Sequence, residues 1–224
     1  MALSASEEET IESLKRWWRE SGKALATGIA IIALGWLGWQ QWQNRQESTV
    51  AEASALYDDV ARRLAVGPEE TVDEAARDEA RDLIGQIRAD YADTPYALYA
   101  ALFSARLAVE EGDLAAAQSD LEWLLDNTRD GWFEQTDPTL VATARLRLGR
   151  VLLAREQPAE AMTVISAAEP GALQPEYAEL RGDIYRAQGQ EEQALEAWRA
   201  AAESGEGSPF LDMKINELAT GASE

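Results

Sequence analysis

The sequence predicts an all-α fold, in which a single N-terminal transmembrane helix is followed by a stack of antiparallel helix pairs. Two observations carry this prediction. Residues 24–44 form a run of 21 positions without a charged side chain. From residue 47 to residue 219 the helix formers Ala, Leu, Glu, Gln and Arg dominate, and β-branched runs are scarce.

Composition excludes several classes of protein. The 224 residues carry 41 acidic and 20 basic side chains, which gives a net charge of −21. Residues 1–44 hold only five of the acidic and four of the basic side chains, so nearly all of the net charge lies after residue 44. Such a body is repelled by nucleic acids and by anionic lipids. Either a solvated surface or a basic partner accounts for this charge. Cys and His are absent, which excludes disulfides, thiol nucleophiles, imidazole chemistry and the usual zinc sites.

The uncharged segment 24–44 is predicted to cross a membrane. At 1.5 Å per residue it makes a helix of about 31 Å, which matches the hydrocarbon thickness of a bilayer. Tryptophans favour the membrane–water interface, and here they flank both ends of the most apolar part: Trp17, Trp18, Trp36, Trp39 and Trp42. A buried core helix would have no reason to carry tryptophan at both ends.

We interpret this segment as a retained anchor rather than a cleaved signal peptide. Its lead-in is long, begins with acidic residues at 7–9, and no A-x-A cleavage pattern follows the apolar run. Arg45 alone follows the span closely, whereas four basic residues precede it and are expected to stay in the cytoplasm: Lys15, Arg16, Arg19 and Lys23. The predicted domains are a cytoplasmic lead (1–23), a transmembrane helix (24–44) and an exported domain (45–224), periplasmic if the source is Gram-negative.

Small residues lie along one face of the predicted span. Ala24, Gly28 and Gly35 share that face at 100° per residue, and small side chains let a second transmembrane helix approach closely. Glycine is also simply common in membrane helices, and the sequence leaves both interpretations open.

Prolines mark the predicted helix starts of the exported part. Pro95 follows Thr94 and Pro138 follows Asp137, so that each pair supplies a cap and a first-turn proline. Pro175 opens another helix in the same way. We further expect a weaker helix pair at 48–65 and 72–91, and a short C-terminal helix at 209–218, which makes about three and a half pairs.

Three segments of the exported part resemble one another. In each, a small residue precedes a tight turn, an alanine follows the turn, and a larger apolar residue comes four positions later. The three sets are Ala105, Ala117 and Leu121; Gly149, Ala161 and Ile165; and Gly182, Ala194 and Trp198. Small residues opposite large ones let two short antiparallel helices pack tightly and stack on the next pair. This pattern resembles the tetratricopeptide repeat, which has a period of 34 residues.

The repeat spacing indicates an insertion. Gly149 to Gly182 is 33 residues, but Ala105 to Gly149 is 44, and we assign the extra residues to the polar loop DNTRDGWFEQTDP. That loop carries Trp132 and Phe133 side by side. They are either an anchor for a partner or side chains that fold back over the repeat groove.

No catalytic, cofactor-binding or metal site is predicted. The neighbouring carboxylates come without a base, a glycine-rich cradle or a calcium-loop spacing. Such pairs on helices are normally solvated faces, and we expect no enzyme activity.

Both ends of the chain resemble one family. The lead KRWWRESGKALATG and the ending MKINELA are similar to the YfgM family, the ancillary subunit of the SecYEG translocon. The resemblance implies a single-pass inner-membrane protein with a periplasmic repeat domain, acting as an adaptor beside the translocon. It implies as partners SecYEG, the membrane-anchored periplasmic chaperone PpiD and nascent exported polypeptides. It also leaves two alternatives: a negative regulator of an envelope-stress signalling protein through the cytoplasmic lead, or a scaffold of another inner-membrane complex.

Overall fold

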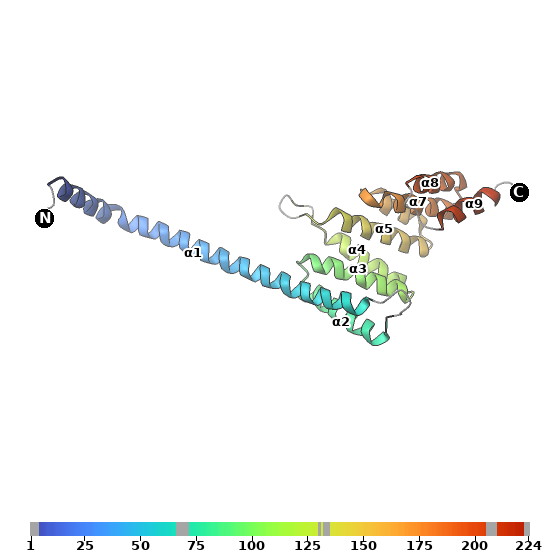
Figure 1. Cartoon of the computed structure of the whole chain (residues 1–224), viewed down its shortest axis with the longest axis horizontal. Coiled ribbons are helices and arrows are strands. Elements are labelled where there is room, and N and C mark those ends of the chain that lie inside the picture. The colour runs from blue at the N-terminus through green and yellow to red at the C-terminus, as the bar shows by residue number, and fades with distance from the viewer. Residues whose placement is uncertain (1–4, 66–71, 130, 132–134, 205–209, 222–224) are drawn as a thin grey trace. The chain divides into compact units, whose positions relative to one another are not determined.

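The computed structural model describes residues 5–65, 72–129, 131, 135–204 and 210–221, and within them the regular elements are all helices (Figure 1). For residues 5–14, 19–21, 23–26 and 29–30 it describes the helical backbone and not the side chains. The predicted all-α fold is therefore confirmed for the described residues.

The helices follow one another in chain order. They are α1 (Ala5–Leu64), α2 (Glu74–Asp90), α3 (Pro95–Glu110), α4 (Leu114–Asp126), α5 (Pro138–Ala154), α6 (Pro158–Ser166), the 3₁₀ turn η1 (Gly171–Leu173), α7 (Gln174–Ala187), α8 (Glu191–Glu203) and α9 (Leu211–Gly221). The chain divides into two compact units, Met1–Ala51 and Glu52–Glu224.

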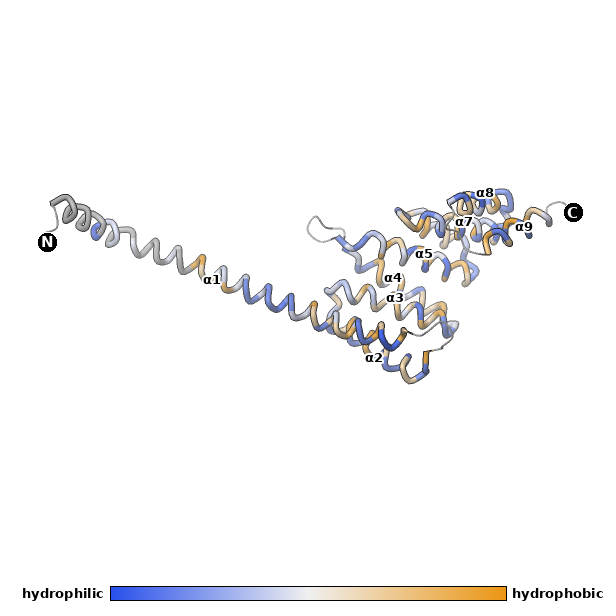
Figure 2. Tube along the Cα trace, in the orientation of Figure 1, coloured by the Kyte–Doolittle hydropathy of each residue, from blue (hydrophilic) through white to orange (hydrophobic). Residues whose placement is uncertain are grey.

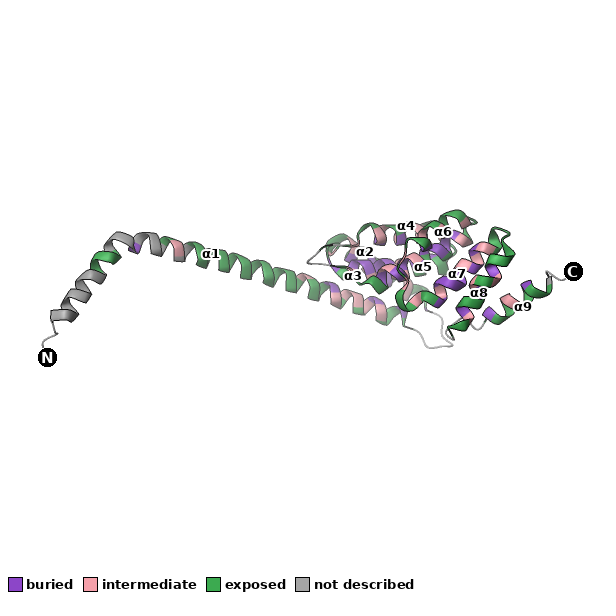
Figure 3. Cartoon of the chain, turned by 90° about the horizontal axis from the view of Figure 1, so that it is seen from above, coloured by how far each residue is buried: buried purple, intermediate pink, exposed green. Residues whose placement is uncertain are grey.

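The first unit consists of the N-terminal part of α1. Residues 31–48 of this helix are all exposed, in agreement with the uninterrupted green of Figure 3. Within the residues that the structure describes, none of the helices combines the length and the apolarity that a membrane crossing requires.

The second unit is built from helix pairs. Helix α3 packs on α4, α5 on α6 and α7 on α8, and each pair also contacts the next, while α9 packs on α8. The helices are amphipathic (Figure 2), and their buried positions gather where they face one another (Figure 3). The largest core cluster joins α3 to α7, a second joins the end of α1 to α2 and α3, and a third joins α7, α8 and α9.

The same backbone turn closes three helix pairs. One residue in each turn has a positive φ: Gly112 at 79°, Glu156 at 60° and Gly189 at 74°. The next amide in each case donates to a carbonyl five residues back: Asp113 to Ala108 at 2.8 Å, Gln157 to Leu152 at 2.9 Å and Gln190 to Tyr185 at 2.8 Å. This is a Schellman-type helix end, which favours glycine, and Glu156 takes it without being one.

The helix starts agree with the proline prediction in part. Helices α3 and α5 begin at Pro95 and Pro138, and an Asp137 carboxylate oxygen accepts from the Thr139 amide at 2.9 Å. Thr94 is the N-cap residue of α3, as predicted, but its side chain makes no capping hydrogen bond; its hydroxyl donates to the Tyr91 carbonyl at 2.8 Å and closes the preceding turn. The proline predicted to start the last helix, at position 209, lies outside the described residues.

The insertion is distributed differently from the prediction, which placed it in the loop from residue 126. Helix α4 has 13 residues where α6 has 9, and α5 has 17 where α7 has 14. The connector 127–137 is longer than its counterpart 167–173 by only four residues. Most of the extra chain is therefore helix, because residues added as nearly whole turns keep the apolar face pointing inward.

Candidate partner-binding surface

Two glycines let the two helices of a pair approach closely, and Gly149 also lies against the next pair. A Cβ at Gly149 would lie 2.7 Å from the Ile165 Cγ2 and 3.0 Å from the Leu180 Cδ2. A Cβ at Gly182 would meet the indole ring of Trp198. The other residues predicted to pack the repeats are buried as well: Ala105, Ala117, Leu121, Ala161, Ile165, Ala194 and Trp198.

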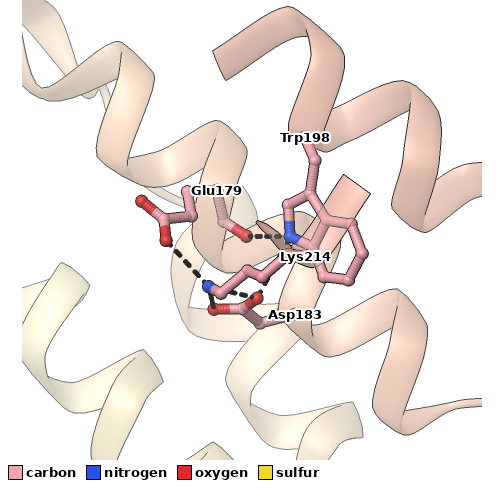
Figure 4. A network of polar contacts seen from close by, with 4 residues as sticks. All are labelled: Glu179, Asp183, Trp198 and Lys214. Carbon is pink, nitrogen blue, oxygen red and sulfur yellow. Dashed lines mark hydrogen bonds and ion pairs between the residues drawn. The ribbon is translucent and has the colours of Figure 1, made fainter. Parts of the chain in front are cut away.

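A polar network ties α9 to α7 and α8 (Figure 4). The Lys214 ammonium donates to Glu179 Oε1 at 2.7 Å and to both Asp183 oxygens at 2.7 and 2.8 Å. The Trp198 Nε1–H donates to Asp183 Oδ1 at 3.0 Å and to the Glu179 carbonyl at 3.2 Å. Burial acts to lower the pKa of Lys214, but the hydrogen bonds that its ammonium donates to Asp183 and Glu179, together with their charges, outweigh burial and raise that pKa above its usual value.

Beside this network lies an open hollow of about 430 Å³. It is lined by residues of α5 and α7 together with Lys214, and Arg150 from α5 brings a second cation to its wall. The Lys214 ammonium forms ion pairs with two carboxylates of this wall, Glu179 and Asp183. Arg150 is the one charged residue of the wall that forms no ion pair with the described residues.

Four aromatic side chains gather on α1 and α3. The Tyr57 ring lies 5.6 Å from Tyr96, 5.8 Å from Tyr99 and 5.6 Å from Phe103, measured between centroids. All four residues are only half-buried. Burial, followed by Tyr99, Asp58 and Tyr96 nearby, raises the pKa of the Tyr57 hydroxyl. Partly buried aromatic groups of this kind combine apolar area with a polar tip.

Three arginines lie near one another on α3 and α5. Arg147 is an exposed residue, but its guanidinium is partly desolvated, and this lowers its pKa from the usual value. The positive charges of Arg106 and then Arg150 lower that pKa further. Arg106 pairs with Glu110 on its own helix at 2.7 Å. No carboxylate of the described residues comes within 4.0 Å of Arg147 or Arg150 in an ion pair. The group therefore has a surplus of positive charge.

The residues predicted for membrane contact and topology lie on α1. The five tryptophans Trp17, Trp18, Trp36, Trp39 and Trp42 are exposed, and the Trp39 and Trp42 rings are 5.5 Å apart. Among the described residues, a Cβ at Gly28 or Gly35 would meet no atom within 4 Å apart from the adjoining backbone of its own helix. Lys15 and Arg16 are exposed. The side chains of Arg19, Lys23 and Ala24 lie outside those described.

Trp132 and Phe133 also lie outside the described residues, although the base of their loop is described. The Thr136 amide donates to the Arg129 carbonyl at 2.9 Å, and the Arg129 amide donates to the Thr136 hydroxyl at 2.8 Å. The Arg129 guanidinium donates to the Asp93 carbonyl at 3.0 Å, which joins the loop base to the turn before α3.

Sequence reasoning missed the aromatic cluster, the arginine group and the role of Lys214. One signal was available: Tyr96, Tyr99, Phe103 and Arg106 recur at spacings of three, four and three residues, which places them on one helix face. The partners from α1, α5 and α9 are contacts between distant segments, which no local pattern shows.

Comparison with known proteins gives full-length similarities. A family model described as a tetratricopeptide repeat-like domain matches residues 15–220. The ancillary SecYEG translocon subunit of Haemophilus influenzae is 30% identical over 97% of this chain and 100% of its own length. The proteins of the same name from Neisseria gonorrhoeae and Escherichia coli are 27% and 26% identical, over 97% of this chain and 100% and 99% of theirs. No solved structure matches significantly.

Proposed function

Since this chain belongs to the family of ancillary SecYEG translocon subunits with a tetratricopeptide repeat-like domain, we propose that it is a membrane-anchored, non-catalytic adaptor of the Sec translocon. The observation that carries the proposal is the similarity over essentially the whole of each relative, from the N-terminal lead through the repeats.

The proposed anchor is a single span at residues 24–44 of the cell inner membrane. Its support is the absence of charge over 21 positions and the tryptophans on either side. The excess of Lys and Arg before the span supports a cytoplasmic N-terminus and a periplasmic C-terminal domain. Gly28 and Gly35, which are open within this chain, are the proposed contact with a translocon helix.

The adaptor surface is proposed to be the helix-pair unit, Glu52–Glu224. Stacked helix pairs present an extended surface of side chains on rigid elements, which suits the capture of polypeptide rather than catalysis. The proposed partners are SecYEG, the periplasmic membrane-anchored chaperone PpiD and nascent exported polypeptides, with Trp132 and Phe133 as a candidate contact.

Photocrosslinking in intact inner membranes tests this function. A photoreactive residue replaces Gly28, Gly35 or Trp132 of the full chain, and adducts are identified by mass spectrometry. Adducts between positions 28 or 35 and SecYEG subunits, together with chaperone or nascent-chain adducts from position 132, are expected. Adducts with lipid and with this chain alone at all three positions would overturn the proposal. A reporter at Gly85, on α2, is the control for chance encounters.

A second candidate function is regulation through the cytoplasmic lead. Trp17 and Trp18, which are 48% and 58% exposed, are adjacent apolar groups that a signalling protein could bind. Deleting residues 1–12, or replacing Trp17 and Trp18 by alanine while the basic residues of the lead are kept, should change the output of an envelope-stress reporter and leave SecYEG crosslinking intact. An unchanged reporter would remove this second function.

A further inference from the structure

The strongest unassigned feature is a continuous stripe on α3. Tyr96, Tyr99, Phe103 and Arg106 follow one another along one face of the helix, at spacings of three, four and three residues. The opposite side of α3 faces the core through small residues such as Ala101 and Ala105. The three rings of the stripe also pack against the core clusters, but they are only partly buried, so the stripe keeps accessible area.

The aromatic end of this stripe is extended by α1. Tyr57 lies within 6 Å, between ring centroids, of Tyr96, Tyr99 and Phe103. Not one of these four residues reaches the burial of the core, where Ile87 and Leu124 are 0% exposed. The rings therefore form a rigid apolar platform that keeps accessible area, the arrangement from which aromatic residues anchor partners.

The cationic end of the stripe continues onto α5. Arg106 lies close enough to Arg147 to lower its pKa, and Arg150 is one helical turn from Arg147. Elsewhere the arginines of this acidic chain commonly pair with carboxylates, as Arg63 does with Glu79 and Arg88 with Asp120. Arg147 and Arg150 have no ion pair among the described residues, so their positive charge is left for an external counter-charge.

We propose that these seven residues, called here the Tyr–Arg surface (Tyr57, Tyr96, Tyr99, Phe103, Arg106, Arg147 and Arg150), bind an acidic polypeptide segment that carries aromatic or aliphatic side chains next to its carboxylates. The arginine guanidinium matches a carboxylate in two parallel hydrogen bonds. The neighbouring rings would cover the apolar side chains of the same segment. This inference rests on the proposed function, because it specifies the surface on which the adaptor takes hold of a polypeptide.

The charge of the whole chain favours a short acidic segment over other anions. A nucleic acid or a lipid surface extends far beyond the three arginines and would meet the repulsion of a chain of net charge −21. A short segment senses charges only within a Debye length, about 8 Å at physiological ionic strength. Within that range the segment meets the three arginines, of which only Arg106 pairs with a carboxylate of the described residues.

Binding of two matched peptides to the purified full chain tests the proposal. One fluorescein-labelled peptide alternates aspartate and glutamate with phenylalanine, and the other carries lysine in place of each acidic residue. Fluorescence anisotropy is expected to show saturable binding of the acidic peptide alone, weakened as the ionic strength rises to about 0.15 M. Equal binding of both peptides, or no binding of the acidic one, would overturn the proposal.

Substitutions locate the binding. Arg147→Glu should weaken the acidic peptide by about tenfold or more, whereas Arg199→Glu, the same change at an exposed arginine of α8, should change it less than twofold. Phe103→Ala should also weaken binding, with Val109→Ala, at an exposed position of α3 outside the stripe, as its control. Far-UV circular dichroism verifies that each variant folds. Equal effects of Arg147→Glu and Arg199→Glu would exclude this surface.

The two proposals fail separately. SecYEG adducts from Gly28 or Gly35 in a chain that binds neither peptide would keep the adaptor function and reject the Tyr–Arg surface. Specific binding of the acidic peptide by a chain that gives no translocon adduct would reject the adaptor function and keep an acidic-segment site.

Discussion

Gly182 of α7 lies directly against the indole ring of Trp198 of α8, so close that a methyl group in place of its hydrogen would come 2.9 Å from the ring Cγ. Trp198 is fully buried, and its Nε1–H donates to Asp183 on the same helix as the glycine. One residue therefore decides how closely the last helix pair packs, and the same ring connects that pair to the Lys214 network.

Gly182→Ala should destabilise the domain. Alanine gains about 1 kcal/mol of helix propensity, but overpacking against a fixed ring costs about 1–3 kcal/mol, and we expect a net loss of up to about 2 kcal/mol in the free energy of unfolding. Urea denaturation of the full chain measures it. Gly85→Ala is the matched control, because a Cβ there meets no atom within 4 Å and should stabilise α2. Equal stabilities of the two variants would contradict the close packing.

Lys214→Met should loosen α9. The change removes the cation from Glu179, which is 8% exposed, and from Asp183. Because the network is partly open to water, we expect a loss of about 1–3 kcal/mol rather than the full cost of a buried charge. Arg186→Met breaks an exposed ion pair to Glu217 between the same two helices and should cost at most about 1 kcal/mol. Protease cleavage after α8 in Lys214→Met alone would support this difference, and equal cleavage would refute it.

Tyr177→Phe should remove part of the loss of stability at alkaline pH. The buried Tyr177 hydroxyl donates to the Ala142 carbonyl at 2.7 Å, and burial raises its pKa above 10.0, although Arg145 acts to lower it. A raised folded-state pKa means that this stability is complete below the unfolded pKa and is lost as the pH rises through the folded value. Phenylalanine should cost about 1 kcal/mol at neutral pH.

The gap between the wild type and Tyr177→Phe should therefore narrow above pH 10. Thermal unfolding at a series of pH values measures both chains. All other residues are the same in both chains, so their contributions cancel in the comparison. A gap that stays constant to the highest pH would show that ionisation of Tyr177 is not linked to folding.

Glu156→Gly should stabilise the turn between α5 and α6. A side chain at a φ of 60° costs about 1–2 kcal/mol, while glycine adds about 0.4–1 kcal/mol of unfolded-state entropy, which leaves a gain of roughly 0.5 kcal/mol. Gly189→Ala, at a φ of 74°, should lose about 1 kcal/mol. The thermal midpoint of unfolding shows whether each variant is more or less stable than the wild type. A higher midpoint for Gly189→Ala would show that the turn does not require a left-handed residue.

Leu34→Arg should detach the chain from the membrane if residues 24–44 span it. Arginine at the centre of a transmembrane helix costs about 2.5–3.5 kcal/mol, and Leu34 is at the middle of the segment. Gln43→Arg, near the end of the segment, should be tolerated because its side chain reaches the interface. Carbonate extraction of membranes separates the two outcomes, and retention of Leu34→Arg in the pellet would oppose the proposed span.

The helix pairs could be predicted because their signals are local. Pro95 and Pro138 mark helix starts, and Gly182, Ala194 and Trp198 stand at offsets that a tight helix hairpin requires. The all-α fold follows from such patterns. The position of the extra residues was predicted only in part, because a turn of helix added to α4 or α5 leaves the apolar period unchanged and gives no signal of its own.

The candidate surface was mostly beyond prediction from the sequence. Tyr57 meets Tyr96 and Arg106 approaches Arg147 only after the pairs have stacked. Lys214 reaches Glu179 across 35 residues of chain. Such meetings depend on the angles between helices, which depend in turn on every side chain between them.

The lengthening of α4 and α5 gives the stack an uneven edge. The turns that close the α3–α4 and α5–α6 pairs match one another, so the added residues belong to the end of α4 and to the start of α5, on either side of connector 127–137. Each addition is close to one turn, a rise of roughly 5 Å. These two helix ends therefore extend about one turn beyond the corresponding ends of α6 and α7, and the connector that carries Trp132 and Phe133 begins and ends on them.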